Sequence, residues 1–262
     1  MRTELSTADD ADARAMYRLG GYSALVLGVA YIAIVAVYAT VGAPPREGEA
    51  WLVYAAGKTT AWWAIVGLSV LTDFLFLPIA FALYLALRDI DRNAMLLATA
   101  FVSSFVFLDL AVTWTNITAL VSLADQYAAA TTDAERAAAV GAANHASAVL
   151  SSTLGGVYSI VTLALGILLI GWVMLRSTFG RTVAYVGIVI GILGIVSVAG
   201  PLLLGGLSLA IVIASVLTTV WVLIVGYRLV RLGRSGALDR LPPDAADSLR
   251  PSLVSTARLP RR

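Results

Sequence analysis

Two acidic residues, Asp73 and Asp109, lie inside long apolar stretches of this 262-residue chain and are the side chains best placed to do chemistry. A carboxylate inside a membrane is costly, so membrane proteins keep one mainly where it faces the protein interior and holds a proton, a cation or a partner. We therefore predict that at least one of the two is protonated or paired with a cation at neutral pH.

The residues around the two aspartates are also polar. Thr113 and Asn116 follow Asp109 at the i, i+4, i+7 spacing of one α-helical face, and Ser69 lies one turn before Asp73. A tyrosine of a later apolar stretch has compatible spacing. Oxygen atoms of these kinds suit a hard cation, a proton relay or a polar ligand group. The predicted ligand- or ion-binding site comprises Asp73, Asp109, Thr113, Asn116, Ser69 and Tyr158.

The same residue types can also join one membrane helix to another without any ligand. Ser, Thr and Asn side chains commonly form hydrogen bonds across helix interfaces in membranes. We favour the binding site over this structural alternative because a pair of intramembrane carboxylates is unusual.

Composition excludes several kinds of chemistry. The absence of Cys rules out disulfides, thiolate metal sites and iron–sulfur clusters, and a single His145 rules out a multi-histidine metal site. Ser147 or Ser151 near His145 could suggest a hydrolase, but no nucleophile-elbow pattern surrounds either serine. We therefore predict no catalytic residue, no metal and no cofactor.

The elements that position these residues are membrane spans. The chain is 60% hydrophobic and 13% charged, whereas soluble proteins average about half apolar and a quarter charged. An apolar run of 18 or more residues is long enough to cross the bilayer as a helix, and the backbone must satisfy its own hydrogen bonds there. We predict an all-α polytopic bundle with six spans near residues 20–42, 61–87, 93–123, 147–175, 182–204 and 207–230.

Two further segments lie outside the predicted transmembrane domain of residues 20–230. Residues 1–19 precede it, and residues 231–262, rich in Arg and Pro, resemble a disordered tail. Two longer loops on the opposite side are expected to hold short amphipathic helices. One loop spans 43–60, and the other, 124–146, contains a capping-box pattern at Thr132 and Glu135.

The distribution of basic residues predicts the orientation. The two chain ends and the 88–92 and 176–181 loops carry 15 basic residues, and the other three connections carry 3. We expect a bacterial plasma membrane, and the positive-inside rule predicts that both termini lie on its cytoplasmic side. Asp73 and Asp109 are then 14 and 16 residues from the cytoplasmic ends of neighbouring antiparallel spans, roughly 21–24 Å deep, so they could face each other.

Possible partners follow from the same distribution. Three arginines lie at or just beyond the cytoplasmic end of the last span, where basic residues attract anionic lipid: Arg228, Arg231 and Arg234. The net charge of +2 gives no reason to expect nucleic acid. The lipid bilayer and a membrane-protein partner are the remaining candidates.

Three stretches carry a resemblance to a known family. They are Asp73 with the following LPIAFALYLALR at 77–88, TTDAERAA at 131–138, and GWVMLRSTFG at 171–180 before a Gly-rich span. Over about residues 18–204 the chain resembles the bacterial membrane domain-of-unknown-function family 4386. Members of that family often have a Pro-Gly pair where this chain has Ile170-Gly171. The resemblance implies six helices and no established activity.

Three functions are compatible with the sequence. The favoured one is binding or translocation of a small ligand or cation at the polar site between the second, third and fourth spans. The alternative is a non-catalytic membrane subunit or scaffold of a larger complex. The third is an enzyme acting on membrane lipid, which would depend on His145 and the longer loops.

Overall fold

The structure of the chain is a computed structural model that describes residues 2–204 and 208–238, and the side chains of residues 11–199 and 213–234. Every regular element in this part of the chain is a helix, so the predicted all-α class is confirmed. The helices are α1 Arg2–Val41, α2 Gly48–Ala55, α3 Thr59–Leu87, α4 Arg92–Leu108, η1 Asp109–Trp114, α5 Thr115–Ala129, α6 Asp133–Ser151, α7 Thr153–Gly156, η2 Val157–Val161, α8 Thr162–Met174, α9 Arg181–Leu204 and α10 Ser208–Leu238.

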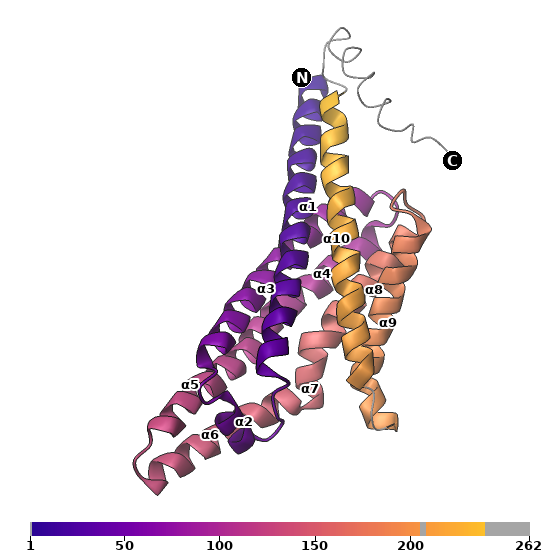
Figure 1. Ribbon diagram of the computed structural model, residues 1–262. Coiled ribbons are helices and arrows are strands. Elements are labelled where there is room, and N and C mark those ends of the chain that lie inside the picture. The colour runs from indigo at the N-terminus through magenta and orange to yellow at the C-terminus, as the bar shows by residue number, and fades with distance from the viewer. Residues whose placement is uncertain (1, 205–207, 239–262) are drawn as a thin grey trace, which may run out of the picture.

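Six segments of the described chain are long and apolar enough to cross a membrane, as the sequence predicts. The six are Ala11–Val41, Thr59–Leu87, Arg92–Ala129, Thr153–Met174, Arg181–Ala199 and Ile213–Arg234. Spans that follow each other in the chain pack side by side, and α10 also packs along α1, so the six form a closed ring. The beginning of α1 and the end of α10 lie at the same end of the bundle, with α2 and α6 at the other (Figure 1).

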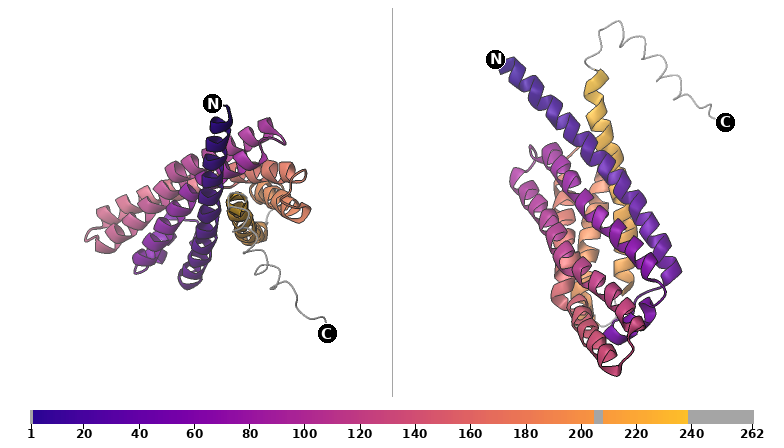
Figure 2. Two further views of the ribbon diagram at one scale, coloured as in Figure 1. Left: turned by 90° about the horizontal axis from the view of Figure 1, so that it is seen from above. Right: turned by 90° about the vertical axis from the view of Figure 1, so that its left-hand side faces the viewer.

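The third and fourth spans differ in extent from the prediction. The third rod, α4–η1–α5, continues to Ala129 and forms with α6 a hairpin that projects from the bundle (Figures 1 and 2). The fourth span begins at Thr153, not at 147, because the chain bends at Ser152, where φ is −69° and ψ is 150°. The Ser152 hydroxyl donates to the Val149 carbonyl at 2.7 Å and accepts from the Gly155 amide at 2.9 Å. One serine therefore ends α6 and caps α7.

A helix is present in each of the two longer loops; α2 is short, as predicted, whereas α6 is 19 residues long and extends beyond its loop to Ser151. α6 begins with the expected capping box: the Glu135 amide donates to the Thr132 hydroxyl at 3.2 Å, and the Thr132 amide donates to the Glu135 carboxylate at 3.1 Å. Amide hydrogen bonds from Thr131 and Thr132 lower the pKa of Glu135 below its usual value. α2 packs against α5 and α6 and buries Trp51 and Leu52.

The first and last helices are longer than their spans. α1 extends back to Arg2, and α10 continues to Leu238, so the first residues of the segment expected to be a tail are helical. Arg231 and Arg234 therefore lie on a helix, and Arg234 donates to the Tyr22 hydroxyl on α1 at 3.1 Å. The rest of the predicted tail lies outside the described residues.

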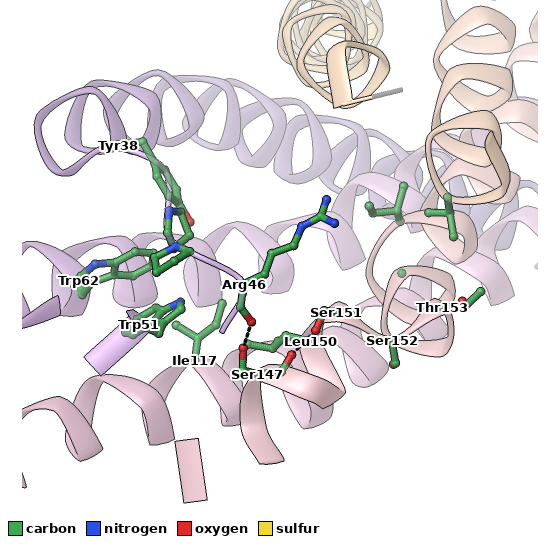
Figure 3. A pocket seen from close by; sticks show the side chains of 15 residues that line it. Tyr38, Arg46, Trp51, Trp62, Ile117, Ser147, Leu150, Ser151, Ser152 and Thr153 are labelled. Atoms are coloured by element: carbon green, nitrogen blue, oxygen red, sulfur yellow. Dashed lines mark hydrogen bonds between the residues drawn. The ribbon is translucent and has the colours of Figure 1, made fainter. Parts of the chain in front are cut away.

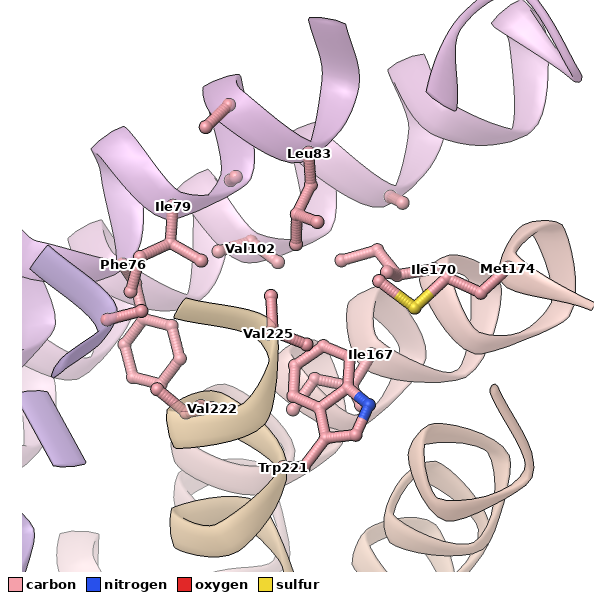
Figure 4. Packing of buried hydrophobic residues seen from close by; sticks show 14 of the residues in the cluster. Phe76, Ile79, Leu83, Val102, Ile167, Ile170, Met174, Trp221, Val222 and Val225 are labelled. Atoms are coloured by element: carbon pink, nitrogen blue, oxygen red, sulfur yellow. The ribbon is translucent and has the colours of Figure 1, made fainter. Parts of the chain in front are cut away.

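The buried apolar residues form two clusters. The larger lies inside the ring and includes Phe76, Val102, Ile167 and Trp221 (Figure 4). The smaller lies at the end that carries α2 and α6. Its members are Val41, Trp51, Leu52, Ala55, Trp62, Ile65, Leu120, Val121, Ala124, Ala139, Ala143 and Ala146. Along both α3 and the third rod, the chain passes from one cluster to the other through an aspartate.

Candidate functional site

Asp73 and Asp109 lie together between the two apolar clusters. Asp73 is in the middle of α3 and Asp109 begins η1, and their residues are only 3% and 6% exposed. The two carboxyl groups are close enough to interact directly, and the Thr113 hydroxyl and Trp114 indole lie beside them. The proximity that the span depths predict is therefore present.

The polar groups of this site are incompletely satisfied. Oδ2 of Asp73, Oδ1 of Asp109 and Nε1 of Trp114 are buried and have no hydrogen-bond partner. The only ion pair in the described part of the chain joins Arg88 and Asp89 at the surface. Buried polar atoms are nearly always hydrogen-bonded. Two buried acids, each with an oxygen that lacks a hydrogen-bond partner and neither with a basic partner in the described chain, therefore distinguish this region.

A change in helix type begins at Asp109. Residues Asp109–Trp114 form a π-helical turn, in which the backbone hydrogen bonds span five residues instead of four. The Thr115 hydroxyl donates to the Leu110 carbonyl at 3.0 Å, and the Asn116 amide donates to the Val112 carbonyl at 2.7 Å. These two side chains donate hydrogen bonds to carbonyl groups within the π turn. The added hydrogen bonds explain how the sequence tolerates the π turn.

The π turn changes which residues share a face with Asp109. In a regular α-helix, residues five apart point in different directions, and residues seven apart share a face. The wider turn brings Trp114, five residues on, beside the carboxyl groups. Asn116, seven residues on, instead bonds its own helix. The helical periodicity therefore missed Trp114.

A second π turn faces the first. Residues Val157–Val161 form η2, which packs against η1, and the Thr162 hydroxyl donates to the Val157 carbonyl at 2.6 Å. In both π turns, a threonine bonds the carbonyl five residues before it. π turns inside α-helices occur frequently at functional sites, and here the two meet beside the aspartates.

The other predicted site residues have more distant roles. Ser69 is buried one turn from Asp73, and its carbonyl accepts from Thr72 at 2.7 Å. Tyr158 is half-buried within η2. Within the described chain, the carboxyl groups of Asp73 and Asp109 form no hydrogen bond with Ser69, Tyr158 or Asn116. The aspartates, Thr113 and Trp114 therefore form the centre of the site.

The hydroxyl and amide groups near the aspartates do not join helices to each other. Thr72, Thr115, Asn116 and Thr162 all donate to carbonyls of their own rods. Side-chain hydrogen bonds between spans occur elsewhere, for example from Trp221 to the Val183 carbonyl at 3.0 Å. Among the groups of the site, the interactions between rods are those of the Asp73 carboxyl group with Asp109 and with the Trp114 indole.

Tyr31 of α1 is a further neighbour that the sequence reasoning missed. Its half-buried side chain is within electrostatic range of both Asp73 and Asp109, and its ring centroid lies 6.4 Å from that of Phe76. The only available signal was a tyrosine within an apolar span that also contains Tyr22 and Tyr38. Its position depends on how α1 packs on α3.

The described residues contain no catalytic arrangement around His145. His145 is exposed on α6, while the Ser147 hydroxyl donates to the Arg46 carbonyl and the Ser151 hydroxyl donates to the Ser147 carbonyl. Neither serine is hydrogen-bonded to the histidine. In the same part of the chain, no three His, Cys, Asp or Glu side chains gather as a metal site.

No family model, curated protein or solved structure matches this chain. The resemblance to domain-of-unknown-function family 4386 therefore stays a prediction.

Proposed function

We propose that this integral membrane protein binds a small monovalent cation at Asp73 and Asp109, between its second, third and fourth spans, and translocates it. The observation that carries this proposal is the pair of buried carboxyl groups, each with an unpartnered oxygen. A buried charge without a partner costs several kcal/mol. A cation between the carboxyl groups would compensate the charge and use both free oxygens.

The ligands available favour a monovalent cation over a divalent one. Ca²⁺ requires about six to eight oxygen ligands, and Mg²⁺ requires a near-octahedral set. The indole N–H of Trp114 occupies one side of the site and can only donate. One proton shared by the two carboxyl groups would leave a single negative charge, which Na⁺ or K⁺ could neutralise.

The two facing π turns support exchange at this site. Asp109 begins η1, η1 packs against η2, and π turns inside α-helices occur frequently at functional sites. We place the protein in a bacterial plasma membrane with both termini in the cytoplasm, because the two chain ends and the 88–92 and 176–181 loops carry 15 of the 18 basic residues of the sequence. The cation would then pass between the cytoplasm and the side carrying α2 and α6.

The proposal can be tested by cation-dependent stability. Full-length protein in lipid nanodiscs is melted at increasing NaCl or KCl, with N-methylglucamine chloride keeping ionic strength constant, at several pH values. A bound cation at a hundred times its Kd stabilises the folded state by about 2.7 kcal/mol. We expect a saturable rise in Tm with one cation, and its loss when Asp73→Asn and Asp109→Asn are combined. Uptake of that cation by proteoliposomes then tests translocation.

The matched control is Asp125→Asn, which changes an exposed aspartate on the same rod. This variant should respond to the cation as the unaltered protein does. A scaffold predicts a different outcome: the double variant changes the basal Tm, but the response to cations is the same in all three proteins. That result, or the absence of any saturable response, would refute the proposal.

A further inference from the structure

A separate cavity of about 500 Å³ lies at the end of the bundle that carries α2 and α6. It is bounded by the end of α1, the segment before α2, the bend between α6 and α7, η2, and α9 (Figure 3). Its volume is within the range of small-molecule sites. Neither Asp73 nor Asp109 lines it, so it is distinct from the cation site.

One side of the cavity carries a free positive charge. Arg46 extends across the space from the segment before α2 (Figure 3), and its guanidinium group has no hydrogen bond or ion pair. No carboxylate lines the cavity. The indole nitrogen of Trp51 lies on the side of its ring that faces Ile117 and Arg46 (Figure 3) and is also without a hydrogen bond. The Arg46 guanidinium and the Trp51 indole N–H are both hydrogen-bond donors, so the ligand group that would match them is an anionic oxygen.

The backbone that carries Arg46 is held in place before any ligand binds. Its carbonyl accepts from the Ser147 hydroxyl on α6. Two residues later Gly48 lies so close to α6 that a Cβ atom there would be 2.4 Å from the Asn144 nitrogen. Pro44 and Pro45 stiffen the approach to this segment. The backbone position of Arg46 is therefore set by the fold, while its side chain is exposed.

The other side of the cavity is apolar and reaches membrane depth. Tyr38, Trp51 and Trp62 form an aromatic wall, with the Trp51 and Trp62 ring centroids 4.9 Å apart. Such residues concentrate at the boundary between lipid head groups and acyl chains. The cavity is also lined by two aliphatic residues of the fourth and fifth spans, Ile160 and Val198. The cavity thus combines an interfacial cation with a surface suited to hydrocarbon.

We propose that this cavity binds one phospholipid, with the anionic phosphate at the Arg46 guanidinium and the start of an acyl chain against Ile160 and Val198. Guanidinium groups bind phosphate oxygens through two parallel hydrogen bonds, which makes Arg46 well suited to this role. A free phosphate ester would satisfy the same charge. It would leave the apolar half of the cavity unoccupied, and for that reason we assign a lipid.

Native mass spectrometry of the full-length protein tests this assignment. Phosphatidylglycerol is titrated against the protein in detergent, and lipid-bound species are counted. We expect one high-affinity lipid in the unaltered protein and about a tenfold weaker Kd for Arg46→Gln, because a charged hydrogen bond is worth roughly one to two factors of ten. Arg46→Lys should recover part of the affinity. Arg136→Gln, which alters an exposed arginine on α6, is the matched control and should bind as the unaltered protein does.

Two outcomes would overturn the assignment. Equal phosphatidylglycerol affinity in Arg46→Gln and Arg136→Gln would show that Arg46 does not hold the phosphate. Binding of soluble glycerol 3-phosphate with the same Arg46 dependence, and displacement of the lipid by it, would identify a soluble phosphate ester as the ligand. Circular dichroism melting of both variants checks that they are folded, so a loss of binding in a folded Arg46→Gln supports the lipid site.

Discussion

At the scale of single residues, the two intramembrane aspartates could be found from the sequence alone. The 1.5 Å rise per residue and the span boundaries place them at one depth, and the structure brings them together. Trp114 could not be found in that way. It reaches the aspartates only because the third rod contains a π turn, and the apolar pattern that identifies a span does not encode such a turn.

Trp114→Phe tests whether the indole N–H belongs to the cation site. An N–H beside carboxyl groups favours their ionised form over the protonated form, so its removal should let protons compete better with a metal cation at neutral pH. We expect the cation concentration at half-maximal thermal stabilisation to rise about tenfold. Trp63→Phe, at an exposed position in the second span, should leave that concentration unchanged. An unchanged or lower value in Trp114→Phe would remove Trp114 from the site.

At the scale of helices, hydropathy located all six spans but not every boundary. The fourth span begins later than expected, because the apolar run continues across a bend that the Ser152 hydroxyl stabilises through local hydrogen bonds. The capping box at Thr132 and Glu135 was predictable, since that motif specifies a helix start by itself. The hydrogen bonds of the Ser152 side chain at the bend have no sequence motif of comparable specificity.

The small residues of α9 allow a quantitative test of helix packing. At Gly191, an added Cβ atom would lie 2.6 Å from Leu168 Cβ and 2.8 Å from the Ala164 carbonyl oxygen on the neighbouring rod. We expect Gly191→Ala to lower the free energy of unfolding, measured by SDS titration in mixed micelles, by about 1–3 kcal/mol. Gly67→Ala, where the added atom meets nothing within 4 Å, should be neutral or slightly stabilising. Equal effects would contradict the close contact.

At the scale of the whole molecule, the polar site separates two apolar clusters within a ring of spans. The number and class of the helices could be predicted because each span has its own hydrophobic signal. The closure of α10 on α1 and the cavity near Arg46 could not. The cavity is assembled from residues between Tyr38 and Val198, and each residue is ordinary for its place in the sequence.

The orientation of the molecule can be measured directly, because the chain contains no cysteine. Single cysteines are introduced as Ala15→Cys near the start of α1 and Ala134→Cys at the exposed start of α6. With both termini in the cytoplasm, a membrane-impermeant maleimide should label Ala134→Cys on intact cells and Ala15→Cys only after the membrane is broken. The opposite labelling would reverse the proposed orientation.

The central claim, a monovalent cation held between Asp73 and Asp109, is tested most directly by locating the ion. Thallium(I) substitutes for K⁺ and scatters anomalously, so crystals of the full-length protein grown with and without thallium acetate can show its position. We predict an anomalous peak between the two carboxyl groups that disappears in the Asp73→Asn, Asp109→Asn double variant and persists in Asp125→Asn. A site without such a peak, in which the two carboxyl groups hydrogen-bond only to each other, would contradict the claim.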